Sequence, residues 1–363
     1  MFLHDARASI ALQKNPLLSV TESTSSLPAS RALFLAGSAA EWKSIYLSQI
    51  SSSTGTSLKL LDVIQDITIL ENIHTEVDVS LCYTAILYGF WSQIWAFRES
   101  WKFHAIAENA DSVHRLWITT QQRELRCEIE RFKDILLSVK TLEAELILTA
   151  QLLMMILHVS PEELQRFAGK SGEDAANEAF VTLERWSNTE QSRRAVWHAA
   201  QVFRWASVLP ATELRDFYAI AVYFAALTMW TYGHLSAYPA RNSSKAAKSM
   251  DQPSASQDSS SMVIINCDES PKTCAFIAGR NDRPALSTVI FKPEIEKDDT
   301  NSEMVIMLSD PNAVLKLARD LYRRNFPFHD GPLPPLVENM GNLMRDLGSL
   351  PDNRFSRCVS PIE

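Results

Sequence analysis

The sequence predicts an all-α fold, a large multi-helix domain interrupted by a disordered Ser-rich insert. Of the 363 residues 46% are hydrophobic, which is enough to bury a sizeable core. Apolar residues recur at helical spacing through most of the chain. Only 10 Gly and 16 Pro are present, which argues against a turn-rich β-sandwich and against a Gly-rich phosphate-binding fold.

The elements are expected in a definite order. Residues 1–30 form a partly disordered lead-in, 31–235 a helical domain, 236–262 a flexible Ser-rich insert, 263–350 the remainder of the helical domain with polar loops, and 351–363 a tail. Apolar periodicity and breakers place the helices at 31–49 (a short pair), 58–70, 78–103, 111–159 (two or three), from 161, 174–186, 193–209, 212–233, from 310 to 326, and 336–347.

Local signals set several helix ends. Ser160 followed by Pro161 predicts a helix start, because Ser is a good N-cap and Pro fits the first helical position. Asp310 followed by Pro311 predicts another start for the same reason. Gly233 is expected just past the end of a helix, where a left-handed conformation favours glycine.

Charge and cysteine spacing exclude several kinds of function. The formal net charge is −8, so the chain offers little to neutralise phosphate and is not expected to bind nucleic acid by itself. The five cysteines include no Cys-x2-Cys pair, so we expect no zinc site and no cofactor in this chain. Their odd number and wide scatter argue against a secreted disulfide scaffold.

Two uncharged stretches raise the alternative of a membrane-embedded helical protein. Leu81–Phe97 and Phe217–Leu235 contain no Asp, Glu, Lys or Arg, and a spanning helix needs about 20 apolar residues. Both contain several polar side chains, and neither has a basic cluster on one flank. Buried central helices without membrane contact are therefore the favoured interpretation, and the spanning alternative stays open.

The densest group of polar side chains lies between residues 197 and 218. His198, Gln201 and Arg204 follow one another at intervals of three, so they share one helix face. Arg215 and Asp216 open the most apolar helix. One interpretation, which we favour, is a hydrogen-bonded anchor in which buried charges are paired. The other is a pocket for a small ligand at the helix junction.

Signals for catalysis and modification are weaker. Asp298 and Asp299, with Glu303 downstream, could bind Mg²⁺ and a diphosphate in an α-helical enzyme of the terpene-cyclase type, although a solvated loop is favoured. The common hydrolase and nucleotide-binding motifs are absent from the sequence, so we expect no enzymatic activity. Lys292 lies in the pattern Phe-Lys-Pro-Glu, a short modifier-attachment signal.

Several stretches, in order along most of the chain, carry a resemblance to a known family. They are Leu27–Arg31 with Glu41-Trp42-Lys43 and Tyr46; His198–Arg204; Leu214–Tyr223 with Trp230 and Tyr232-Gly233; Asp310-Pro311; Tyr322–Pro327; Leu333–Glu338; and Leu343–Gly348. Together they resemble the regulatory region of fungus-specific transcription factors of the xylanolytic-activator type, in the subgroup with Cys2His2 zinc fingers upstream.

The resemblance implies a regulatory role in RNA polymerase II transcription in the nucleus. The partners it implies are the transcription machinery or co-regulator proteins, a small effector, and a second copy in a homodimer. DNA contact and zinc are implied only for an upstream module, which we expect to be missing from this chain.

Overall fold

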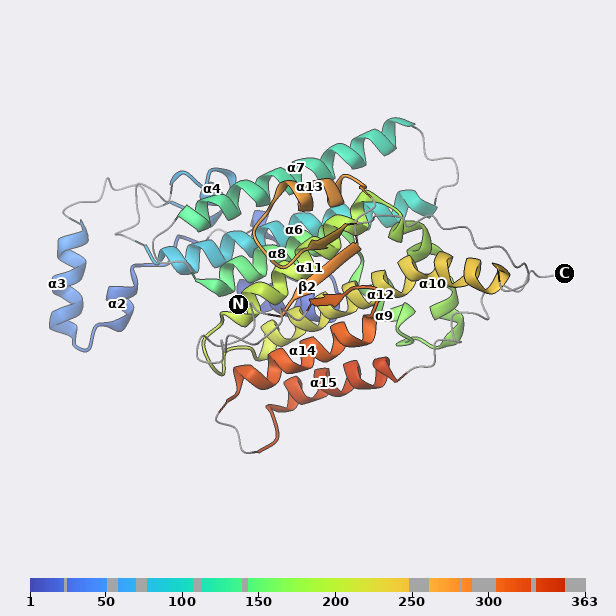
Figure 1. The fold of residues 1–363 in the computed structure, drawn as a ribbon. Helices are drawn as coiled ribbons and strands as arrows, with labels where there is room; N and C mark the ends of the chain where they lie inside the picture. The colour runs from blue at the N-terminus through green and yellow to red at the C-terminus, as the bar shows by residue number, and fades with distance from the viewer. Residues whose placement is uncertain are drawn as a thin grey trace. The chain divides into compact units, whose positions relative to one another are not determined.

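The computed structural model describes residues 1–22, 25–50, 58–69, 77–106, 112–138, 143–247, 261–280, 283–288, 305–327 and 331–349. Fourteen α-helices and one small three-stranded sheet make up the elements of this part of the chain, which confirms the predicted all-α class (Figure 1). The chain divides into two compact units, Met1–Leu142 and Glu143–Glu363. No division was expected at 142/143, because helical periodicity in the sequence continues through these residues.

The first unit is built around one long helix. Its elements are α1 (Phe2–Leu12), a 3₁₀ turn η1 (Val20–Glu22), α2 (Arg31–Leu35), α3 (Ala39–Ile50), α4 (Leu60–Gln65), α6 (Val79–Ile106) and α7 (Ser112–Ser138). Helices α1, α4 and α7 all contact α6. Phe132 of α7 meets Tyr83 and Phe90 of α6 edge to face, with ring centroids 5.7 and 5.8 Å apart.

Polar side chains fasten α1 to α6. The Arg7 guanidinium donates to the Tyr88 hydroxyl at 2.6 Å, and the Trp91 indole donates to the Ser9 hydroxyl at 2.8 Å. The Arg98 guanidinium donates to the Gln13 amide oxygen at 2.9 Å. Because Ala6 and Ile10 are buried between these bonds, the N-terminal helix is an integral part of the unit. The lead-in predicted to be partly disordered therefore contains an ordered helix.

The second unit holds the remaining elements. They are α8 (Ala144–His158), α9 (Pro161–Phe167), α10 (Glu173–Ser187), α11 (Glu190–Ser207), α12 (Asp216–Ala247), β1 (Met262–Ile264), α13 (Pro271–Ile277), β2 (Arg283–Ser287), β3 (Val305–Met307), α14 (Pro311–Asn325) and α15 (Pro335–Gly348). Helix α8 is buried on every side from Leu146 to His158, as expected for a charge-poor central helix. It packs on α11 and α12, and α12 also contacts α14 and α15.

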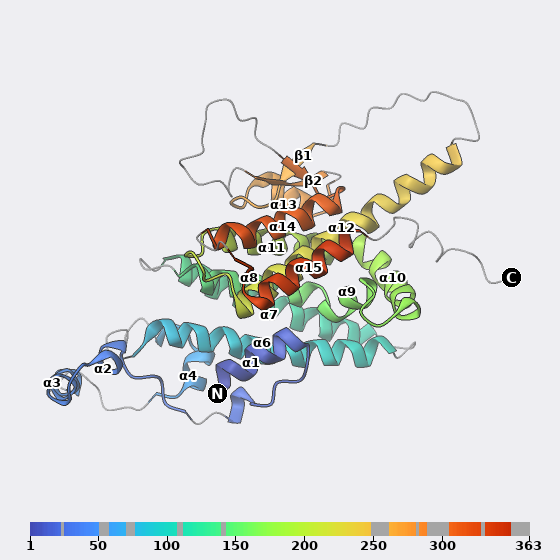
Figure 2. The same cartoon turned by 90° about the horizontal axis from the view of Figure 1, so that it is seen from below.

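A small sheet follows α12 in the chain. Strand β1 pairs in parallel with β2, and β2 pairs antiparallel with β3. The Asn266 amide extends the pairing, because its Nδ2 donates to the Ser287 carbonyl at 2.8 Å and its Oδ1 accepts from the Ser287 amide at 2.9 Å. Figure 2 shows the sheet and α13 against α11 and α14, which matches the α11–α13 and α14–β3 contacts.

Several predicted boundaries are confirmed. Ser160 caps α9 by accepting from the Glu163 amide at 3.4 Å, and Asp310 caps α14 by accepting from the Ala313 amide at 3.1 Å. Pro161 and Pro311 occupy the first turns of these helices. In α15 the buried side chains are Val337, Met344 and Leu347, whereas Leu343 is exposed.

The predicted end of α12 at Gly233 is wrong. The helix continues to Ala247, so residues 236–247 of the predicted flexible insert are helical and the expected boundary at 235 is also wrong. Gly233 is instead a point of close approach, because a Cβ there would collide with the Leu308 carbonyl oxygen. The missing side chain lets the backbone after β3 approach the helix. Residues 248–260 of the predicted insert and the tail at 351–363 lie outside the described residues.

Candidate functional site

Helix α11 carries most of the polar side chains singled out from the sequence. Thr189 caps its start by accepting from the Ser192 amide at 3.3 Å. Val196, Ala199, Phe203 and Ala206 recur at helical spacing and are buried. His198 and Gln201 are buried as well, so the polar side of α11 faces other parts of the protein.

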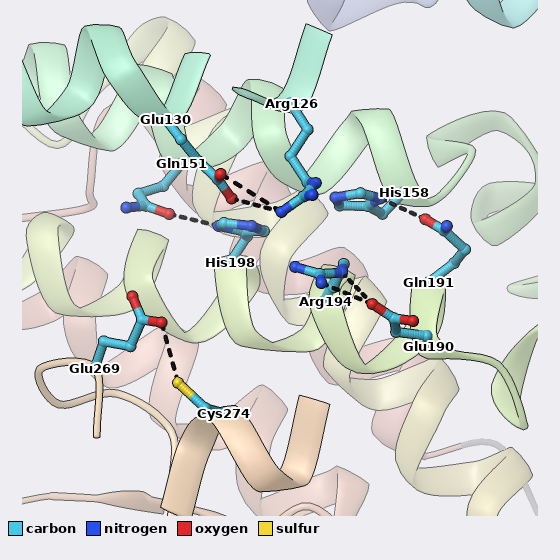
Figure 3. A network of polar contacts seen from close by, with 10 residues as sticks. All are labelled: Arg126, Glu130, Gln151, His158, Glu190, Gln191, Arg194, His198, Glu269 and Cys274. Atoms are coloured by element: carbon cyan, nitrogen blue, oxygen red, sulfur yellow. Dashed lines mark hydrogen bonds and ion pairs between the residues drawn. The ribbon is translucent and has the colours of Figure 1, made fainter. Parts of the chain in front are cut away.

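Two glutamine–histidine pairs join α11 to α8 (Figure 3). His198 of α11 bonds Gln151 of α8, with 2.7 Å between Nδ1 and Oε1. His158 of α8 bonds Gln191 of α11, with 2.5 Å between Nδ1 and Oε1. On each helix the glutamine precedes the histidine by seven residues, and the helices run antiparallel. The two bonds are therefore reciprocal.

The two imidazoles stack between these bonds. Their centroids are 6.0 Å apart and their planes differ by 13°. An amide oxygen only accepts hydrogen bonds, so Nδ1 of each ring is the donor. Each glutamine thus fixes the orientation and the Nδ1 proton of the histidine on the other helix. The sequence analysis found His198 but missed Gln151, His158 and Gln191; the shared seven-residue spacing from Gln to His on both helices was the available signal.

Gln201 and Arg204 face the segment that connects β1 to α13. The Gln201 amide donates to the backbone carbonyls of Ile265 and Cys267 at 3.0 and 2.8 Å. Arg204 forms an ion pair with the exposed Asp268, with 2.7 Å between Nη1 and Oδ1. These contacts support the anchor interpretation for Gln201 and Arg204, because both side chains hold a segment more than sixty residues away in sequence.

Cys267 lies in the anchored segment and Cys274 in α13 just after it, and both thiols have a raised pKa. Burial raises the pKa of Cys267 above its usual range. The hydrogen bond from the Cys274 thiol to the Glu269 carboxylate, 3.2 Å long, raises the pKa of Cys274 (Figure 3). A nucleophilic or metal-binding cysteine needs a lowered pKa, so these environments favour the protonated thiol.

Arg215 and Asp216 are not part of a buried anchor. Both residues are exposed, and Arg215 lies 3.8 Å from the Glu213 carboxylate in an exposed pair. An exposed pair of this kind contributes little to stability, so the anchor interpretation of Arg215 and Asp216 is wrong. The sequence placed them at the start of an apolar helix correctly, but their own side chains are open to solvent, and the buried part of α12 begins with Phe217.

The junction between α12 and α14 is held by Asn325 instead, which the sequence analysis did not single out. Its side-chain oxygen accepts from the Leu214 amide at 2.8 Å, and its nitrogen donates to the Pro210 carbonyl at 2.9 Å. One turn earlier, the Tyr322 hydroxyl donates to the Ala219 carbonyl at 2.7 Å. Burial raises the pKa of Tyr322 well above its usual value, and nearby Tyr223 adds to the effect.

The remaining candidates are outside this region or outside the described residues. Within the described residues, no group of three or more His, Cys, Asp or Glu side chains is arranged to hold a metal ion. The acidic residues Asp298–Glu303 and Lys292 lie outside the described residues. Among the helices described, none is by itself long and apolar enough to span a membrane; α8 and α9, bent by 70°, meet the length and composition limits only as a pair.

Comparisons with known proteins give no relative. No family model matches the chain, and no curated protein and no solved structure matches it. The resemblance to fungal transcription factors therefore remains a prediction from the sequence.

Proposed function

We propose that this chain is the regulatory region of a fungal RNA polymerase II transcription factor. It acts in the nucleus through co-regulator proteins or a small effector, and makes no DNA contact of its own. DNA binding, and the zinc it requires, belong in this proposal to a separate upstream module. The acidic net charge of −8 agrees with that division of labour.

The supporting observation is the junction around Asn325. Two of the stretches that carry the family resemblance, Leu214–Tyr223 and Tyr322–Pro327, are about one hundred residues apart in sequence. They meet through the bond from the Leu214 amide to Asn325 and the bond from Tyr322 to the Ala219 carbonyl. Two of the stretches that resemble the family therefore hold one helix junction together. A fold shared with the family would require these stretches to contact each other.

The anchored segment gives the proposal a physical form. The third stretch, His198–Arg204, contacts two other parts of the chain. His198 bonds α8, while Gln201 and Arg204 bond residues 265–268. A segment that a few directional polar bonds hold against a helix, as Gln201 and Arg204 hold residues 265–268, can adopt discrete alternative arrangements, and a partner that prefers one arrangement shifts the population. Regulation in this proposal acts on such a shift.

The experiment is a transfer of function. The full chain is fused to a DNA-binding module from an unrelated bacterial repressor, and transcription is measured from a reporter that carries the matching operator in a fungal host. We expect the fusion to raise or lower transcription relative to the module alone. Asn325→Ala, which removes buried bonds, should abolish the effect, whereas Asn339→Ala, at an exposed position of α15, should preserve it.

Two outcomes of this reporter experiment would contradict the proposed function. The proposal fails if the fusion accumulates in the nucleus and resists limited proteolysis, yet transcription equals that of the module alone. Retention of the full effect in an Asn325→Ala fusion that has become sensitive to proteolysis would also contradict it, because the effect would then not depend on the fold.

A further inference from the structure

The dipeptide Ser-Pro occurs three times in the sequence, beginning at Ser160, Ser270 and Ser360. A kinase pocket shaped for the proline ring selects such a serine, because any other residue at that position brings a backbone N–H that the pocket leaves without an acceptor. Ser360 lies outside the described residues, so the structure describes two of these candidate phosphorylation sites. The dipeptide by itself does not distinguish between them.

Ser160 and Ser270 have the same local structure. Each is the N-cap of a helix that begins with proline, α9 for Ser160 and α13 for Ser270. Each hydroxyl oxygen accepts from the backbone amide three residues later, at 3.4 Å from Glu163 and at 3.3 Å from Thr273. Both serines are half-buried and both have an extended backbone. Local conformation therefore does not separate them either.

The surroundings of the two serines differ. Val159 and Pro161, on either side of Ser160, are buried, and α9 packs on α10 and α12. Around Ser270 the neighbouring side chains are exposed: Asp268, Glu269, Pro271 and Lys272. A kinase has to contact the serine and the residues on both sides of it. The stretch 268–272 offers these contacts in the folded chain, whereas the stretch around Ser160 offers them only after local unfolding.

The stretch 268–272 is also held weakly. Asp268 pairs with Arg204, but the Asp268 side chain is 90% exposed, and exposed ion pairs contribute little to stability. The bonds between Ser270 and Thr273 lie within the first turn of α13. The buried side chains Phe276 and Ile277 come later in the helix. A kinase can therefore engage this stretch at a small cost in contacts with the rest of the chain.

From these observations we propose that Ser270 is a phosphorylation site for a proline-directed protein kinase. Its Oγ forms a bond to the γ-phosphorus of ATP while the bond from that phosphorus to the β,γ-bridging oxygen breaks. ADP leaves, and a carboxylate of the kinase takes the hydroxyl proton. The phosphate, with a charge of about −1.5 to −2 at pH 7, enters two residues from Asp268, the ion-pair partner of Arg204. The inference does not depend on the proposed role in transcription.

The first experiment measures the rates at which the two serines are phosphorylated in the folded chain. The full chain, purified from bacteria, is incubated with a mitogen-activated protein kinase and ATP, and the phosphate at each serine is quantified by mass spectrometry. Synthetic peptides spanning 154–166 and 264–276 give the intrinsic rates. Relative to these peptides, Ser270 should be modified at least about tenfold faster than Ser160, because Ser160 becomes accessible only through local unfolding.

Two results of this experiment overturn the proposal. One is a folded chain that receives no phosphate at Ser270 although the peptide 264–276 does. The other is a ratio of rates that is the same in the folded chain and in the peptides, because the fold would then select neither serine.

The second experiment uses variants that keep α13 capped. Ser270→Thr retains both the cap and an acceptor hydroxyl and should still be phosphorylated, whereas Ser270→Ala should not. Pro271→Ala should lower the rate at Ser270 about tenfold, and Lys272→Ala, the exposed neighbouring control, should change it less than about twofold. Circular dichroism checks that each variant is folded. An unchanged rate in folded Pro271→Ala overturns the proposal, because recognition would then not depend on the proline.

Discussion

Two helix pairs in this protein show opposite ways of using an amphipathic helix. In the second unit, α8 and α11 are buried against each other, and reciprocal glutamine–histidine bonds join them. In the first unit, α2 and α3 pack on each other but leave Phe34, Trp42 and Tyr46 exposed. All four helices were expected from apolar periodicity, yet α8 and α11 bury their apolar faces within the chain, whereas α2 and α3 leave large apolar side chains exposed.

The difference shows that periodicity specifies a helix face without specifying its partner. For α8 and α11 the partner is part of the same unit, so substitutions there should change the stability of the fold. For α2 and α3 the face is exposed, so substitutions there should leave the folded chain nearly as stable. The following expectations test this contrast, beginning with the largest effect.

Deleting one large aromatic side chain from each pair is the most direct test. Phe203→Ala in α11 should lower the free energy of unfolding by about 3–5 kcal/mol, because Phe203 is fully buried and a cavity would remain. Trp42→Ala in α3 should lower it by less than about 1 kcal/mol, since Trp42 is 44% exposed and its truncation at the surface encloses no cavity. Urea unfolding followed by circular dichroism measures both. Equal losses would remove the contrast.

A single added methyl group tests how closely the second unit is packed. Gly233→Ala should destabilise the protein by about 3 kcal/mol, because the new Cβ would meet the Leu308 carbonyl and a backbone atom cannot easily move away. Gly341→Ala in α15 is the control: nothing lies within 4 Å, so it should stabilise by about 0.5–1 kcal/mol. Thermal unfolding of the two variants should shift in opposite directions, and a neutral Gly233→Ala would contradict the close approach.

The reciprocal pairs allow a comparison within one interface. Gln151→Leu should cost about 1–3 kcal/mol, because it leaves the buried Nδ1 proton of His198 without its amide acceptor. Gln191→Leu should cost less than about 1 kcal/mol, since Gln191 is only partly buried and water can replace it. Chemical unfolding at neutral pH gives both values. A larger loss for Gln191→Leu would show that burial does not control the strength of these bonds.

The junction of α12 and α14 should be sensitive to alkali. Tyr322→Phe removes the bond to the Ala219 carbonyl and should cost about 1 kcal/mol at neutral pH. The pKa of Tyr322 is raised well above its usual value in the folded state, so above about pH 10 only the unfolded state releases this proton. Stability of the unaltered protein should then fall by about 1.4 kcal/mol per pH unit more steeply than that of Tyr322→Phe. Parallel curves between pH 10 and 11 would refute this.

The smallest effect is expected at Arg215. Arg215→Ala should change the free energy of unfolding by no more than about 0.5 kcal/mol, because the side chain is exposed and its 3.8 Å contact with Glu213 is solvated. An anchor would behave otherwise, and the variant would unfold or lose its cooperative transition. Differential scanning calorimetry distinguishes the two outcomes.

The sequence predicted only part of the candidate site. Intervals of three along α11 correctly grouped His198, Gln201 and Arg204, since side chains at that spacing share a face. Arg215 and Asp216 were added because they are near in sequence, and the structure shows them exposed. The partners of the group, at residues 151 and 265–268, are about fifty to sixty residues away, a distance over which no local pattern operates.

By itself the sequence determined the all-α class, most helix positions and the capped starts at Ser160 and Asp310, because these depend on interactions within one or two turns of the chain. Only the tertiary structure decided the division at residue 142 and the continuation of α12 through Gly233. A glycine can end a helix, or it can lie inside a helix where another backbone segment approaches closely. The sequence alone does not distinguish these two roles. The Leu308 carbonyl, brought in by the packing of distant segments, made the difference.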